Sequence, residues 1–362
     1  LGLAGDIWKK YIVYLLAWDE NVFSRTVEKN GGIIGESLRQ AAIHDLTIWQ
    51  ELLTHGDVLV GRELALIHDF APTRAGTPAS DGRIIDSLLS ALCQLPPEQM
   101  VDTLVQHYGT YGSGQIAAFP AFRWDEKNGL EGIRHPEIVC LQDIVGYESQ
   151  KEVLVKNTEA FLSGKPANHV LLVGARGTGK SSSVKGLVNQ YFDQGLRLVE
   201  VPKYQLKYLN KIINTLRGRS LKFILFLDDL SFEDSETEYK HLKSMIDGGI
   251  EARPDNVILY ATSNRRHLIR EDWSDRAGSQ DIHAADSVHE KVSLSDRFGI
   301  ILTFSTPDQD KYLKIVDALA ARHRIQLPQD ELHRRALRWE LSHSGRSGRV
   351  AQQFIHYLRG TS

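Results

Sequence analysis

Cysteine is scarce in this chain: only Cys93 and Cys140 occur among 362 residues. The two lie in different segments and form no CxxC pair, so the sequence offers neither a disulfide framework nor a cysteine zinc site. A chain without such cross-links fits a reducing compartment. We therefore expect a cytoplasmic protein.

Long apolar runs are also absent. The longest, Tyr11 to Trp18, has 8 residues and follows Lys9 and Lys10, whereas a membrane-spanning helix needs about 18 or more. We expect no contact with a membrane and interpret this segment as an amphipathic docking helix. Internal repeats and low-complexity tracts are missing as well.

No charge of one sign dominates the composition. The formal net charge is −3, with 42% hydrophobic and 25% charged residues, as in ordinary globular proteins. The distribution is uneven: residues 1–135 hold 11 Lys+Arg and 17 Asp+Glu, and the remainder holds 32 and 29. A chain of this length predicts two or three domains. We assign an acidic, mainly helical N-terminal domain to 1–135, an α/β domain to 136–306 and a small helical lid to 307–362.

The pattern of apolar residues supports this division. The N-terminal part has helical blocks at 7–27, 43–53 and 84–92, then a Gly-rich loop at 108–114 and a linker at 125–136. From residue 136, strand-like and helix-like segments alternate, which predicts a parallel sheet flanked by helices. Predicted strands are 170–173, 196–201, 223–227, 257–261 and 300–304. Predicted helices are 182–192, 204–216, 236–246, 308–323, 329–341 and 348–358.

The strongest motif is a P-loop, Gly174-x-x-x-x-Gly179-Lys180-Ser181. Its glycines let successive backbone N–H groups surround a phosphate, and the following helix presents its positive N-terminus to the same anion. Lys180 is expected to reach the β- and γ-phosphates of ATP, and Ser181 to bind Mg²⁺. The predicted nucleotide-binding residues of the loop are Gly174, Ala175, Arg176, Gly177, Thr178, Gly179, Lys180, Ser181 and Ser182.

Two carboxylates follow the second predicted strand after the P-loop. Phe223 to Leu227 is apolar and is followed by Asp228 and Asp229, which places both at the carboxyl edge of a parallel sheet, where ligands bind. Asp228 is the predicted Mg²⁺ residue and Asp229 the predicted base for the attacking water. Capping of the next turn is the alternative role for either residue.

With these motifs, residues 136–362 resemble the AAA+ superfamily of oligomeric ATPases. The resemblance implies that Leu141–Glu148, with Ile144 and Val145, lies against the adenine, and that Asn264 is the sensor 1 residue. It also implies that Arg297, in Ser295–Phe298, is an arginine finger acting on a neighbouring subunit of a homo-oligomer. Arg349 is the expected sensor 2 arginine, with Arg346 as the alternative. The motif sequences are further similar to a bacterial family described only as ATP-binding proteins of unknown function.

Two features depart from the superfamily pattern. A Glu usually follows the Walker B Asp, whereas this chain has Asp229, so hydrolysis is expected to be slow or to involve Glu233. The aromatic-apolar-Gly pore loop of the unfoldase-type members is replaced by Pro202-Lys203-Tyr204-Gln205. This difference argues against a motor that threads polypeptides.

One basic stretch and one polar cluster suggest further ligands. Residues 201–222 contain no acid and six bases, of which Lys203, Lys207 and Lys211 have helical spacing. The stretch predicts either contact with a nucleic-acid backbone or a solvated helix face. The polar cluster, in 281–289, holds Asp281, His283, Asp286 and His289, whose spacing matches no known metal-ligand pattern.

These observations favour an AAA+ ATPase that uses Mg²⁺ and ATP to remodel or load a macromolecular partner, recognised by its N-terminal domain. A slow nucleotide-dependent switch or scaffold is the alternative. A small-molecule kinase also fits the P-loop, but Arg297 and the helical lid argue against it.

Overall fold

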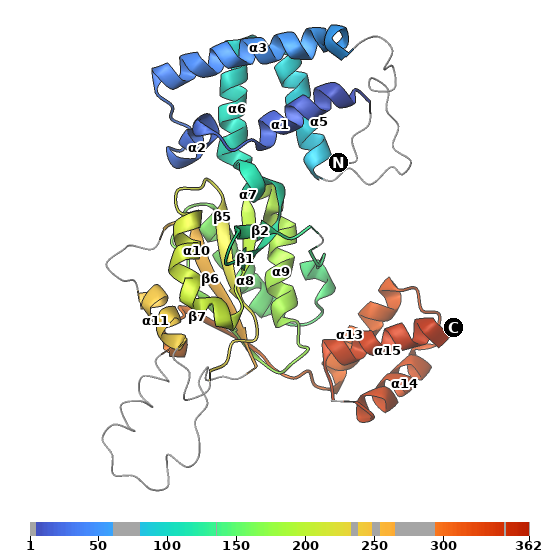
Figure 1. The fold of residues 1–362 in the computed structure, drawn as a ribbon. Helices are drawn as coiled ribbons and strands as arrows, with labels where there is room; N and C mark the ends of the chain where they lie inside the picture. The colour runs from blue at the N-terminus through green and yellow to red at the C-terminus, as the bar shows by residue number, and fades with distance from the viewer. Residues whose placement is uncertain are drawn as a thin grey trace, which may run out of the picture.

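The computed structural model describes residues 5–60, 80–134, 136–232, 238–247, 254–264, 294–343 and 345–361. Within these ranges the chain forms a helical N-terminal region, a sheet covered by helices on both faces, and a C-terminal helical bundle (Figure 1). None of the helices that the structure describes is long and apolar enough to span a bilayer.

The helices and strands have the following bounds. The helices are α1 (Ile7–Trp18), α2 (Val22–Lys29), α3 (Glu36–Val60), α5 (Ser80–Gln94), α6 (Pro97–Tyr111), α7 (Gly114–Ala118), α8 (Glu148–Leu162), α9 (Lys180–Tyr191), α10 (Leu209–Leu216), α11 (Tyr239–Asp247), α13 (Gln309–Arg322), α14 (Gln329–Leu341) and α15 (Gly348–Thr361). Short 3-10 helices cover Leu141–Asp143, Phe192–Gln194 and Lys203–Tyr208. The strands are β1 (Ala121–Asp125), β2 (Gly129–Gly132), β3 (Val170–Gly174), β4 (Leu196–Glu200), β5 (Lys222–Leu227), β6 (Val257–Ser263) and β7 (Ile300–Phe304).

The sheet has the order β2-β1-β4-β5-β6-β3-β7. All neighbours are parallel except β1 and β2, which are antiparallel. The register pairs Val173 of β3 with Ser263 of β6, and Leu227 of β5 with Ala261 of β6. Since parallel strands end at a common edge, the P-loop, Asp228 and Asn264 meet there. The predicted fold class is confirmed as an α/β architecture: a mostly parallel sheet flanked by helices, with a mainly helical N-terminal region and a small helical C-terminal part.

The core lies on both faces of this sheet because side chains alternate along each strand. Phe223, Leu225 and Leu227 of β5 pack with α10 and α11, whereas Ile224 and Phe226 pack with α8 and α9 on the opposite face. All five residues are at most 1% exposed. The apolar run 223–227 therefore reads as a strand buried on both faces.

The structure differs from the sequence-based interpretation at two places before the P-loop. Part of the expected linker is strand β2, and β1 pairs with β4 to extend the sheet. The apolar pattern of these short strands is weak because each carries a charged residue. These residues, Arg123 and Glu131, form an exposed ion pair across the two strands at 3.0 Å. The single helix expected over 7–27 is two helices, since Asn21 and Ser24 form a capping box that starts α2.

The basic stretch also differs from expectation. Residues Lys203 to Tyr208 are a 3-10 helix, so the i, i+4 spacing of the lysines does not continue a single α-helical face into α10. Two of the six bases have partners within the protein: Arg219 is buried, and the half-buried Lys222 donates from its amine to the Asp255 carbonyl at 3.0 Å. Lys207 and Lys211 are exposed. Contact with nucleic acid stays a prediction.

The N-terminal helices are joined to the sheet through buried polar contacts. The Arg219 guanidinium lies 2.9 Å from Glu28 and 3.0 Å from Glu20, and Ser113 also donates to Glu28. Nearby, Arg197 of β4 is fully buried and donates to the carbonyls of Ile116 and Ala117, at the end of α7. Charged groups without water are stable only when paired, so these contacts fix one region against the other.

We expect Arg219→Ala to loosen this junction. Glu28 is fully buried, and removing its partner leaves a buried carboxylate without a counter-charge, which costs about 3–5 kcal/mol. Urea unfolding measures the free energy, and limited proteolysis between residues 1–113 and the sheet measures the loosening.

Arg25→Ala is the matched control, because Arg25 contacts the same Glu20 at 3.6 Å with both side chains solvent-exposed. Such a pair contributes about 1 kcal/mol or less. Equal losses in the two variants would contradict the assigned role of Arg219.

Candidate nucleotide-binding site

The P-loop is shaped by glycines that no other residue can replace without strain. Gly174, Gly177 and Gly179 have φ values of 141°, 74° and 94°, in the region that L-residues rarely adopt. A Cβ on Gly174 would lie 2.0 Å from the Phe304 carbonyl oxygen of β7. The loop can therefore turn tightly from β3 into α9, leaving the N-terminus of α9 facing the cavity.

Lys180 begins α9 and is 6% exposed. Its amine donates to the carbonyls of Gly174 and Ala175 at 2.8 and 2.7 Å and to the Asn264 side-chain oxygen at 3.1 Å. Burial lowers the pKa of the Lys180 amine, and the charges of Asp229 and Asp228 oppose that shift. The oxygens that accept from the Lys180 amine are uncharged, so this cation suits an anionic ligand.

Asp228 directly follows β5 and faces the P-loop. Its Oδ1 accepts hydrogen bonds from Ser181 Oγ and from Thr262 Oγ1, both at 2.6 Å. A hydroxyl and a carboxylate at this distance are hard oxygen ligands of the kind that Mg²⁺ uses together with phosphate oxygens. The residues present therefore fit the expected metal.

Asp229 has an unusual backbone, with φ of 51°. Asp tolerates this left-handed region better than most residues. Its N–H donates to Thr262 Oγ1 at 2.9 Å, and its carboxylate accepts from the Asn264 amide and lies 3.7 Å from Arg176. The structure thus brings Asp229 and Asn264 together beside Lys180. Glu233 lies outside the described residues, as do the four polar residues of 281–289.

A cavity of about 820 Å³ opens in front of these groups, within the range of small-molecule sites. Its polar lining includes the P-loop, Asp228, Asp229 and Asn264. Apolar side chains also line it, from Ile144 and Val145 before the P-loop and from Ile315 and Leu319 of the lid, together with polar lid residues such as Arg322 and His323. A ligand with both an apolar part and a charged chain suits this mixed lining.

Tyr147 is a cavity-lining residue that the sequence analysis did not single out. It is buried, has φ of 70°, and donates from its hydroxyl to the Ser305 carbonyl at 2.6 Å. The Lys311 amine of the lid lies 3.4 Å from its ring centroid, a cation–π contact. The lid is also tied to this segment by Arg322, 2.6 Å from Asp143. Tyr147 follows Gly146 in the expected adenine segment, which was the available signal.

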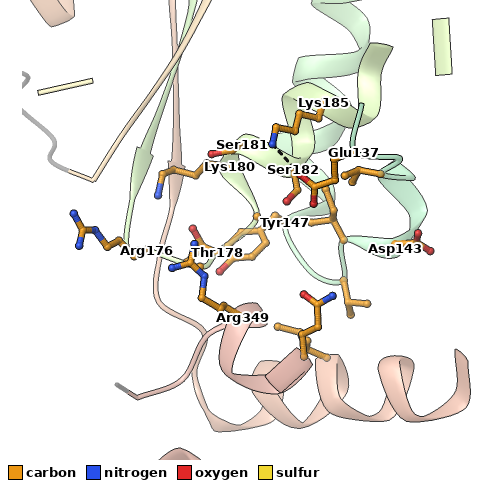
Figure 2. A pocket seen from close by; sticks show the side chains of 18 of the residues that line it. Glu137, Asp143, Tyr147, Arg176, Thr178, Lys180, Ser181, Ser182, Lys185 and Arg349 are labelled. Atoms are coloured by element: carbon orange, nitrogen blue, oxygen red, sulfur yellow. Dashed lines mark hydrogen bonds and ion pairs between the residues drawn. The ribbon is translucent and has the colours of Figure 1, made fainter. Parts of the chain in front are cut away.

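The two candidate sensor 2 arginines have different surroundings. Arg349 lines the cavity, and Figure 2 shows it projecting from the start of α15 toward Thr178 of the P-loop. The backbone N–H of Arg349 donates to the Gly177 carbonyl at 3.3 Å. Arg346 instead pairs with Glu340 inside the lid at 2.8 Å, where Glu340 is 6% exposed. This arrangement favours Arg349 as the lid residue that contacts a ligand.

Arg297 lies apart from the cavity of its own chain and is not among the lining residues. Its Nε is 2.5 Å from Asp247, at the end of α11. In this position it contributes nothing to the cavity just described. A role at the nucleotide of another subunit is compatible with this placement.

Lys185 was also missed by the sequence analysis. It lies one turn after Ser181 and Ser182 on α9, lines the same cavity, and pairs with Glu137 at 2.8 Å (Figure 2). Helical spacing from the P-loop was the signal that could have identified it.

Residues 117–362 match the family described as "Protein of unknown function (DUF815)". The chain belongs to this family. Among solved structures, the DUF815 chain is similar to the Thermotoga maritima RuvB Holliday junction branch migration motor, with 19% identity over 61% of this chain and 64% of that one, at a TM-score of 0.41. A RuvB variant of the same organism gives 16% identity, coverages of 60% and 71%, and a TM-score of 0.36. The first match covers less than two thirds of the RuvB chain.

We expect Lys180→Ala to weaken ATP binding by about 10- to 100-fold, because a hydrogen bond to a charged group contributes roughly 1.5–3 kcal/mol. Titration with a fluorescent ATP analogue measures the affinity. Lys185→Ala is the control on the next turn of the same helix, with an exposed ion-pair partner, and we expect a smaller loss. Unchanged ATP binding in Lys180→Ala would contradict the assignment of this cavity as a nucleotide-binding site.

Proposed function

We propose that this DUF815 chain is an AAA+ ATPase that binds and hydrolyses Mg-ATP at subunit interfaces, and thereby remodels or loads a macromolecular partner. The observation that carries the proposal is one cavity lined by the P-loop, by Asp228 and Asn264 from two other strands, and by Arg349 from the lid. Phosphoryl transfer depends on such positioning of charged groups more than on covalent chemistry.

Each group has a distinct role in this proposal. Ser181 and Asp228 would hold Mg²⁺, which neutralises phosphate charge when bound. Lys180 exchanges its present carbonyl acceptors for phosphate oxygens. Asp229 accepts the proton of the attacking water while Asn264 orients its carboxylate. Arg349 approaches the phosphates from the lid, and Ile144 and Val145 contact the base.

A slow switch or scaffold, assembled by ATP and rarely hydrolysing it, is the second candidate. The specific observation in its favour is the short Asp229 side chain, which is already engaged by Asn264 and faces Arg176. Turnover separates the two functions: a remodelling ATPase is stimulated by its partner well above its basal rate, and a switch is not.

Asp229→Asn is expected to retain ATP and to lose turnover by about 10²- to 10⁴-fold, the range of a general base. The residue acts in the transition state rather than in ground-state binding, so KM should change little. Steady-state ATPase kinetics measure both quantities. Glu233→Gln is the matched variant, and a selective loss of turnover there, with Asp229→Asn active, would exchange the two assignments.

We propose that the protein acts as a homo-oligomer, since Arg297 does not line the cavity of its own chain. In an assembly, Arg297 would leave Asp247 and meet the phosphates bound by the next subunit. Its charge would stabilise the transition state, an effect of about 10³ to 10⁵ in related phosphoryl transfers.

Mixing two inactive variants tests this arrangement. Arg297→Ala keeps its P-loop and Lys180→Ala keeps its finger, so co-assembly should create composite sites with partial ATPase activity. Asp247→Asn is a control that alters only the partner of Arg297 within its own chain. A mixture that stays inactive despite verified co-assembly would exclude a finger acting between subunits.

The acidic N-terminal helices are our proposed recognition element for a protein partner in the cytoplasm. Since β1 and β2 belong to the sheet and the family match begins at residue 117, we further propose that the boundary of the ATPase domain lies near that residue.

A further inference from the structure

Thr262 of β6 is 1% exposed and forms hydrogen bonds to Asp228, Asp229 and Leu230, the three residues that follow β5. Its Oγ1 donates to Asp228 Oδ1 at 2.6 Å. The same oxygen accepts from the Asp229 N–H at 2.9 Å. Its carbonyl accepts from the Leu230 N–H at 2.7 Å. One residue on a neighbouring strand thus holds both carboxylate-bearing positions of the site.

These contacts bear directly on the conformation of Asp229. Even for Asp, which tolerates it better than most residues, a left-handed φ of 51° is less favourable than the usual regions, and such a conformation persists where its surroundings hold it. Among the described residues only Tyr147 and Arg324 also combine a side chain with positive φ. The hydrogen bond from the Asp229 N–H to Thr262 Oγ1 holds this peptide, while Asn264 contacts the carboxylate itself.

The contact with Asp228 is equally constrained. A threonine hydroxyl has one proton to donate and lone pairs to accept with. At Thr262 the proton is used by Asp228 and a lone pair by the Asp229 N–H, so the hydroxyl orientation is defined by both. Valine has the same shape and can make neither bond, whereas serine can make both. The side-chain oxygen, rather than the methyl group, links β6 to the turn.

We propose that Thr262 is a positioning residue for ATP hydrolysis: it orients Asp228 toward Ser181 and holds Asp229 in its left-handed conformation. This inference rests on the proposed ATPase function. Thr262 lines the cavity, but its hydroxyl is engaged by Asp228 and by the Asp229 N–H, so it acts through the two aspartates. Its effect should therefore appear in Mg²⁺ dependence and kcat, and not in the affinity for metal-free ATP.

The test compares Thr262→Val with Thr262→Ser. We expect Val to lower kcat by about 10- to 100-fold, the value of one hydrogen bond to a charged group, and to raise the Mg²⁺ concentration at half-maximal rate. Binding of ATP in the presence of a chelator should stay within about 2-fold of wild type. Serine should restore most of the rate. Equal impairment in Val and Ser would overturn the proposal, because it would assign the effect to the methyl group.

Hydrogen exchange gives a readout that does not depend on hydrolysis. In the nucleotide-free protein, Val should increase amide exchange in the peptide that contains Asp229 and Leu230, and Ser should not. Thr262→Ala gives a second hydroxyl deletion if Val does not fold. If the wild-type protein hydrolyses no ATP but exchange is faster in Val, the ATPase function is disproved and the hold of Thr262 on the turn is retained. If Val has wild-type exchange and kinetics, the positioning role of Thr262 is disproved.

Discussion

The pairing of β6 between β3 and β5 is the constraint on which the candidate site depends. This central strand aligns the end of β3, which continues into the P-loop, with the end of β5, which continues into Asp228. It also supplies Asn264 just beyond its own last residue. Backbone hydrogen bonds of a parallel sheet thus set the separation of three groups that are distant in sequence. Their side chains then need only local contacts to meet.

The sequence predicted the part of the fold in which hydrophobic pattern and local chemistry agree. Strands β3 to β7 are rich in apolar residues, and their bounds were predicted within two residues. Glycines and turn residues likewise identified the P-loop. Asp228 could be placed near the P-loop because parallel strands share an edge, and Asn264 was placed there by the resemblance to the AAA+ superfamily. The roles of these residues stay predictions until they are tested in solution.

Contacts that depend on the third dimension were not predictable in this way. Strand β1 pairs with β4, about 75 residues later, and carries the charged Arg123. Helix α6 contains glycine and many polar residues, so the helical spacing of its apolar residues is weak, although His107 and Tyr108 are buried. Arg219 looked like one base of a cationic stretch, yet it is buried against Glu28 and Glu20. Thr262 gave no signal, since a threonine within a strand is ordinary.

The proposed function requires above all that the cavity binds ATP together with Mg²⁺. Calorimetric titration of the wild-type chain with ATP, with and without Mg²⁺, tests this requirement most directly. We predict one nucleotide per chain and tighter binding when Mg²⁺ is present, with a stabilisation of the fold that grows with ligand concentration. No detectable heat at millimolar ATP in a folded protein, or binding that is indifferent to Mg²⁺, would contradict the proposed Mg-ATP site.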